Sequence, residues 1–157
     1  MDEARRGYVE EFGLLFEGFG LSRMVGRVLG ALLVCPPERS AEELAGMLGA
    51  SRGSISQATR MLVGTGMVRR ISKPGERRDY FGVRQGTWME LTRRQMAATT
   101  ALREIAERGL ELVDSTDGGA RRGLEEMRNF YAFWEEELPA ALEKWETASK
   151  GSAEEVR

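Results

Sequence analysis

Two adjacent arginines, Arg77 and Arg78, follow a Pro-Gly turn in the segment KPGERRDYF, residues 73–81. A guanidinium group is a planar fork of N–H donors, and this geometry matches the paired oxygens of a phosphate or a carboxylate. Lys73 precedes the turn, so the tip of this segment is strongly cationic. The segment predicts contact with an anionic partner.

A second group of polar side chains lies just before it, in SRGSISQATRML, residues 51–62. On a helix, one face of this segment is apolar and turns inward, with Ile55, Ala58, Thr59 and Leu62. The opposite face carries no acid and no large apolar group, and it consists of Arg52, Gly53, Ser56, Gln57 and Arg60. The major groove of B-DNA accepts such a helix, in which Gln can bind adenine and Arg can bind guanine. Taken alone, this face is equally compatible with an ordinary solvated surface.

The charges of the chain are unevenly distributed. Residues 50–94 contain ten basic and three acidic residues, whereas residues 1–49 contain five and eight, and residues 95–157 contain eight and fourteen. The net charge of −2 therefore conceals a basic middle segment between two acidic ends. This distribution indicates one cationic face.

Short elements position the two polar groups. Ser40 and Glu43 have the spacing of a capping box at the start of SAEELAGMLGA, and Gly49 is expected to end that helix. A short link leads to the helix that Ser51 caps, which predicts a helix-turn-helix. MVRRIS and DYFGV then predict the two strands of a hairpin around KPGERR. The order helix, helix, hairpin is that of a winged helix, in a fold that is mainly α with a small β-hairpin wing.

In a winged helix, Arg77 and Arg78 lie at the wing tip, where the negative potential of a narrow DNA minor groove attracts arginine. Glu76 and Asp79 flank this pair and are expected to hold its guanidinium groups by bidentate bonds. The cationic stripe is expected to continue along the phosphates through Arg69, Arg70, Lys73 and Arg84.

Helical segments surround this region. Val9, Phe12, Phe16 and Phe19 fall on one helical face, and LSRMVGRVLGALLVCPP predicts a core helix that ends at Pro36-Pro37. A longer helix is expected from a capping box at Thr87 and Glu90 to about Val113. The last helix is expected over 120–148, with a kink at Pro139. It carries a nearly heptad seam of Leu124, Met127, Tyr131, Trp134, Leu138, Leu142 and Trp145.

These helices exceed what a small winged domain needs, and two DNA-binding copies gain much affinity over one. We therefore expect a homodimer, with residues 21–86 as the DNA-binding domain and residues 1–20 and 87–150 as the helical dimerisation region. Residues 151–157 are expected to form a flexible tail. The alternative is that the terminal helices pack only on their own domain.

Several functions are disfavoured by composition. The chain has no histidine, which removes the commonest general base and metal ligand, and it shows no phosphate-binding loop or nucleophile motif. We expect no enzyme activity, no cofactor and no metal. Cys35 is the single cysteine and is expected to be a small buried residue rather than a redox sensor. The longest uncharged apolar run, residues 28–37, is too short to cross a bilayer, so a cytoplasmic protein with no membrane partner is expected.

The segment from SAEELAGML to DYFGV resembles the winged helix-turn-helix core of MarR-type transcriptional regulators, in particular the GbsR/MarR-like branch and its actinobacterial repressors of efflux transporters. The resemblance covers about residues 7–95, and Glu76 stands where the wing motif of the family commonly has Asp. It implies a homodimer, a palindromic double-stranded DNA operator, and repression that a small lipophilic or aromatic effector relieves. The DNA-binding positions that it implies are Ser51, Arg52, Ser54, Ser56, Gln57, Arg60, Arg77 and Arg78, to which the charge pattern adds Lys73.

An effector pocket is a further hypothesis. Apolar and aromatic side chains make adaptable surfaces, and an arginine among them could bind a polar head group. The candidate lining residues are Phe12, Phe16, Phe19, Arg23, Arg27, Met67, Phe81 and Trp88. Such side chains more often form an ordinary core. For the whole protein, the alternative to a DNA-binding regulator is a winged helix that binds another protein without specific DNA binding.

Overall fold

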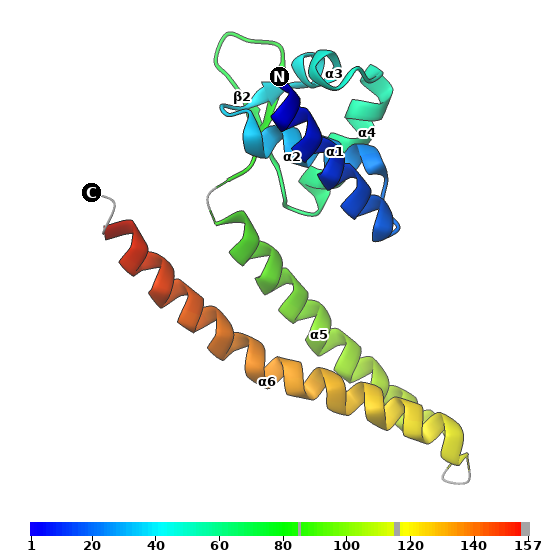
Figure 1. Cartoon of the computed structure of the whole chain (residues 1–157). Helices are drawn as coiled ribbons and strands as arrows, with labels where there is room; N and C mark the ends of the chain where they lie inside the picture. The colour runs from blue at the N-terminus through cyan, green and yellow to red at the C-terminus, as the bar shows by residue number, and fades with distance from the viewer. Residues whose placement is uncertain (85, 115–116, 155–157) are drawn as a thin grey trace. The chain divides into compact units, whose positions relative to one another are not determined.

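The computed structural model describes residues 1–84, 86–114 and 117–154, and it forms two compact units, Met1–Leu91 and Thr92–Arg157. The described elements are, in chain order, α1 (Glu3–Gly18), α2 (Arg23–Val34), β1 (Arg39–Ser40), α3 (Ala41–Leu48), α4 (Arg52–Gly64), β2 (Arg69–Ser72), β3 (Asp79–Gly82), α5 (Thr87–Leu112) and α6 (Gly118–Glu154) (Figure 1). The expected fold class, mainly α with a small β wing, is confirmed.

Helices α1 and α2 pack closely against each other in the first unit (Figure 1). Val9 and Phe16 of α1 are buried, and Phe12 is half-buried. Glycines allow the approach, since a Cβ atom at Gly26 would lie 2.2 Å from the carbonyl oxygen of Phe12. Phe19, which the sequence pattern assigns to the same helical face, is instead the C-cap residue of α1 and is 70% exposed.

The core of the first unit lies where α2, α3 and α4 meet the sheet. Val28, Leu29, Leu44, Ile55 and Leu62 are at most 1% exposed. Cys35 is buried at the end of α2, as expected for a small apolar side chain. The apolar face that the periodicity of α4 predicts is therefore confirmed as core.

Local capping starts and ends the helix-turn-helix as the sequence predicts. The hydroxyl of Ser40 accepts from the backbone N–H of Glu43, and the Glu43 carboxylate accepts from the backbone N–H of Ser40 at 2.7 Å. Gly49 ends α3 with φ +58°, a left-handed conformation that favours glycine. Ser51 then caps α4.

The wing is part of a three-stranded antiparallel sheet in the order β1-β3-β2. The β2–β3 hairpin was predicted, with Arg70 opposite Phe81 and Ser72 opposite Asp79. Strand β1 was not predicted. It is two residues long and pairs with β3, and so joins the start of the helix-turn-helix to the wing.

The second unit is an antiparallel pair of helices, formed by α6 and the part of α5 that follows Leu91 (Figure 1). Arg103 bonds the Glu135 carboxylate at 2.6 Å, and Arg93 pairs with Glu146. A Cβ atom at Gly109 would lie 2.9 Å from Leu124, so this glycine allows close packing of the two helices.

Two boundaries differ from the sequence-based expectation. Thr87 is the first helical residue of α5 rather than its cap, and its hydroxyl accepts from the backbone N–H of Arg84 at 3.2 Å. Helix α6 continues through Pro139 and beyond residue 148 to Glu154, so residues 151–154 of the expected tail are helical, and 155–157 lie outside the described residues. None of the helices in the described part of the chain is long and apolar enough to cross a membrane.

Candidate nucleic-acid interface

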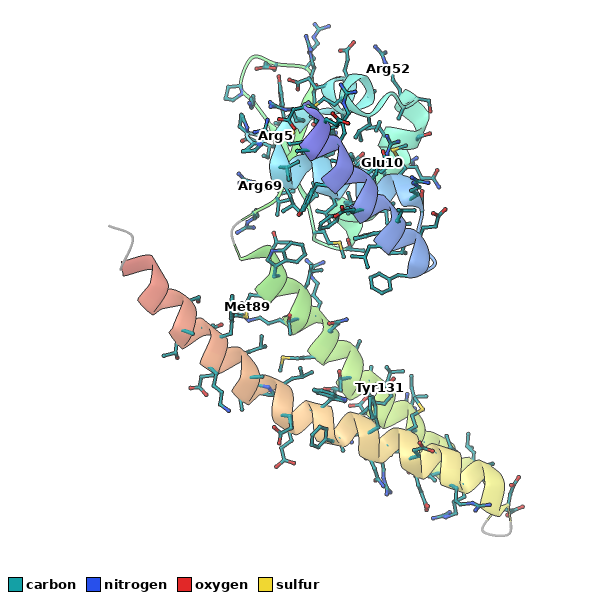
Figure 2. All side chains as sticks on the ribbon, viewed as in Figure 1. Arg5, Glu10, Arg52, Arg69, Met89 and Tyr131 are labelled. Carbon is teal, nitrogen blue, oxygen red and sulfur yellow. The ribbon has the colours of Figure 1, made fainter. Side chains whose placement is uncertain are left out.

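The outer face of α4 is polar and exposed. Arg52, Ser56, Gln57 and Arg60 are exposed, while the residues between them, Ile55, Ala58 and Thr59, are buried. Figure 2 shows the position of Arg52 in the first unit. The arrangement leaves one continuous polar face of a helix whose opposite face is fixed in the core.

Two serines at the start of α4 are engaged in capping. The Ser51 hydroxyl accepts from the backbone N–H of Ser54 at 3.1 Å, and the two hydroxyl oxygens lie 2.9 Å apart, within a hydrogen bond. Ser54 is half-buried. Both residues were predicted to contact DNA, and their side chains already stabilise the first turn of the helix.

Lys73 is held against the wing itself. Its Nζ atom lies 4.1 Å from the centroid of the Tyr80 ring, a cation–π contact. The hydroxyl of Tyr80 donates to the Glu76 carboxylate, and this bond raises the pKa of Tyr80. These contacts connect the two sides of the wing loop.

The expectation that Glu76 and Asp79 hold Arg77 and Arg78 is wrong. Glu76 accepts from Tyr80, as just described, and Asp79 pairs with Arg70 and accepts from the Ser72 hydroxyl at 3.3 Å. The bond from Arg70 is the main reason that the pKa of Asp79 lies below its ordinary value. The reason for the difference is strand register, because Ser72 stands opposite Asp79 and brings Arg70 within reach of that carboxylate.

Arg78 and Arg52 share a partner that sequence reasoning missed. One oxygen of Glu42 lies 3.0 Å from Nη2 of Arg52, and the other lies 3.6 Å from Nη1 of Arg78. Glu42 is in the first turn of α3, where an acid is expected for its effect on the helix dipole. No local pattern reveals its contacts, because Arg52 and Arg78 come close to it only in the folded unit.

A cavity of about 680 Å³ opens between α3, α4 and the sheet. Its cationic lining comes from Arg52, Arg60, Arg70 and Arg78, and Ser56 also lines it. Glu42 and Asp79 also line it. The structure thus brings the polar face of α4 and the base of the wing to one concave surface.

Two of the predicted side chains have no partner among the described residues. Gln57 on α4 and Arg77 in the wing loop are both exposed, and neither side chain bonds to another residue of the described chain. Their polar groups are therefore available to an external partner. Arg60 bonds only the Ser56 carbonyl within its own helix, at 3.2 Å.

The residues proposed to line an effector pocket lie in different environments. Phe16 and Phe81 are buried, Phe12 and Met67 are half-buried, and Trp88 is 52% exposed. Arg23 and Arg27 both bond the Glu10 carboxylate, at 2.9 and 2.7 Å. Phe81 lines the cavity beside α4, whereas Arg27 lines a separate one with Met1 and Met47.

Comparisons with known proteins identify the family. A model of MmpR5-like MarR family transcriptional regulators matches residues 86–148. The HTH-type transcriptional regulator MmpR5 of Mycobacterium tuberculosis (strain ATCC 25618 / H37Rv) is 40% identical over 139 residues, which are 88% of this chain and 84% of the relative. A crystal structure of a transcriptional regulator is 38% identical, with a TM-score of 0.81 over 92% of this chain and 99% of that one.

The family predicted from the winged helix-turn-helix motif is confirmed, and the matching model is the MmpR5-like one. These relatives are regulators rather than enzymes. This chain therefore belongs to the MarR family and is a transcriptional regulator.

Proposed function

We propose that the protein is a cytoplasmic homodimer that represses transcription by binding a palindromic operator and is released by a small lipophilic ligand. In this proposal residues 21–86 bind DNA, and residues 1–20 and 87–150 form the dimer. Each α4 enters a major groove, and each wing contacts the flanking minor groove.

The polar face of α4 is the observation that carries the DNA-binding proposal. Gln57 and Arg60 project from a helix that Ile55 and Leu62 fix in the core, so the polar groups are presented on a rigid scaffold. A positioned Gln or Arg can form paired hydrogen bonds with one base in the major groove. Arg77 supports contact with phosphates or a narrow minor groove, since its guanidinium group has no partner among the described residues.

Large apolar side chains support the dimer. Phe130 and Phe133 of α6 are each 55% exposed, Trp145 is 63% exposed, and Ile105 of α5 is 50% exposed. A pair of helices that leaves several aromatic side chains in water gains free energy when a second copy covers them. Helix α1 adds Leu14 and Leu15, both about half exposed.

Exposed aromatic side chains also support binding of a lipophilic ligand, because Phe19 and Trp88 in the first unit are 70% and 52% exposed. Binding at Trp88 predicts quenching of tryptophan fluorescence that the Trp88→Phe variant loses. Quenching that persists in that variant would place the ligand elsewhere.

A mobility-shift experiment tests the DNA-binding proposal with three proteins. Wild type should shift a fragment of its own upstream region, and Arg77→Glu should fail to do so at the same concentration. Arg77 has no partner among the described residues, so its reversal should leave the fold intact. Arg122→Glu, on α6 in the other compact unit, makes the same charge change and should shift the DNA as wild type does.

If wild type fails to shift the fragment, the DNA-binding proposal is wrong for that region. Equal loss in Arg77→Glu and Arg122→Glu, with both variants still dimeric, would show that total charge, rather than the wing, determines binding.

A further inference from the structure

Glu42 lies between two arginines of the candidate DNA interface. Its two oxygens contact different guanidinium groups, at 3.0 Å for Arg52 of α4 and 3.6 Å for Arg78 of the wing loop. Guanidinium groups bind phosphate oxygens through the same charge-assisted N–H···O hydrogen bonds that they form with a carboxylate. The carboxylate and the DNA backbone would therefore compete for the same donors.

The contact is exposed and so can be exchanged. The side chains of Arg52, Arg78 and Glu42 are 81%, 63% and 61% exposed. Exposed ion pairs contribute little to stability, because water solvates both partners well. The two acids of the wing differ from Glu42, since Glu76 and Asp79 are bonded within the wing to Tyr80 and Arg70.

The competition should act differently on correct and incorrect DNA. Nonspecific binding depends almost wholly on cations that contact phosphates, so an acid that engages two of those cations opposes it directly. At a matching site an arginine contacts a base edge instead. A guanidinium group has five N–H donors, so Arg52 can keep its Nη2 bond to Glu42 while other donors contact a guanine.

We propose that Glu42 is a specificity-determining residue of the DNA interface. It keeps Arg52 and Arg78 from phosphates on DNA of the wrong sequence, and it orients Arg52 at the operator. This role rests on the DNA-binding function proposed above and adds to it a residue that lowers affinity for nonspecific DNA.

The test compares wild type with Glu42→Gln on operator and scrambled DNA by fluorescence anisotropy. Gln keeps the shape and one acceptor oxygen but removes the charge. At about 0.1 M salt, Glu42→Gln should bind scrambled DNA about fivefold more tightly. Its affinity for the operator should change by less than about twofold, so the specificity ratio falls by about fivefold.

Two further variants make the result specific to this contact. Glu11→Gln makes the same charge change on the exposed surface of α1, where Glu11 has no ion-pair partner among the described residues. It should leave the specificity ratio unchanged. Glu42→Asp retains the negative charge and should keep scrambled binding weak. Equal thermal unfolding temperatures of the variants establish that the fold is intact.

Three results would overturn this role. If Glu42→Gln binds both DNAs more tightly by the same factor, the effect is one of general charge. If it binds both DNAs more weakly, Glu42 has a structural role. An unchanged variant shows no role at all. If wild type prefers the operator in any of these cases, the proposed function stands. Wild type that binds neither DNA overturns the function and, with it, the role of Glu42.

Discussion

Gly26 of α2 lies directly against the backbone of Phe12 in α1, and a methyl group at position 26 would come within 2.2 Å of the Phe12 carbonyl oxygen. The Gly26→Ala variant must therefore separate the two helices. We expect a loss of about 3 kcal/mol in the free energy of unfolding, because backbone atoms cannot move aside as a flexible side chain would. Chemical denaturation measures this loss.

Gly46 of α3 provides the matched control for this prediction. A Cβ atom there meets nothing within 4 Å, so Gly46→Ala should stabilise the helix by about 0.5–1 kcal/mol. Equal effects of the two substitutions would contradict the close α1–α2 packing.

The capping box of α3 makes stability depend on pH. Hydrogen bonds from the backbone N–H and hydroxyl of Ser40 lower the pKa of Glu43. The stabilising contribution of the ionised Glu43 carboxylate is therefore complete above the pKa of about 4.3 that the group has in the unfolded chain. It is lost as the pH falls through the lower pKa of the folded state. Glu43→Ala should cost about 1 kcal/mol at neutral pH and less at about pH 3.

Denaturation at the two pH values measures the difference between Glu43→Ala and wild type. Glu11→Ala is the control, because it removes an exposed carboxyl group that has no partner among the described residues and caps no helix. A cost for Glu43→Ala that is equal at both pH values would exclude an ionised carboxylate as the capping group.

Gln57 should contribute to sequence preference rather than to general affinity. Its side chain is exposed on α4 and carries no charge, so Gln57→Ala removes hydrogen bonds to a base without removing a phosphate contact. Binding to the operator should weaken by about 1–3 kcal/mol, with scrambled DNA unaffected. Competition titrations measure the affinities for operator and scrambled DNA. Equal weakening of binding to the two DNAs would mean that Gln57 contacts the DNA backbone.

Phe133 should lie in the dimer interface. It is 55% exposed on α6, and a carboxylate at this position would be buried without a partner in a dimer. Phe133→Glu should raise the dissociation constant of the dimer at least tenfold, which corresponds to a loss of about 1.4 kcal/mol in the free energy of dimerisation. Sedimentation equilibrium measures this constant. Ala132→Glu places the same charge on the preceding position of α6, which is also exposed, and should raise the dissociation constant less. A Phe133→Glu dimer as tight as the wild-type dimer would exclude this face of α6 from the dimer interface.

Local patterns predicted the parts of the fold that local interactions determine. The capping box of Ser40 and Glu43, the Ser51 cap and the buried face of α4 follow from residue types a few positions apart, and each is confirmed. Long-range contacts were not predictable in this way. Strand β1 is only two residues long, and it forms because Arg39 meets Phe81 across the sheet.

The same limit applies to the candidate site. Gln57 and Arg60 were identified because a helix places them on one face, and both are exposed there. Glu42 was not identified from the sequence, because its contact with Arg78 joins residues far apart in the chain. Lys73 was assigned to the phosphates on charge alone, yet its ammonium group stacks on Tyr80. Gly13 of α1 likewise allows Arg23 and Arg27 of α2 to pack close to α1, a contact that no local pattern predicts.

Sequence-specific DNA binding by a dimer is the central claim, and one titration tests it most directly. Fluorescence anisotropy of wild type is measured against DNA from its own promoter and against scrambled DNA over a series of salt concentrations. We predict affinity that falls steeply with salt on both DNAs, a large preference for the promoter and two chains per site. A folded, dimeric protein that binds neither DNA at low salt would contradict the claim.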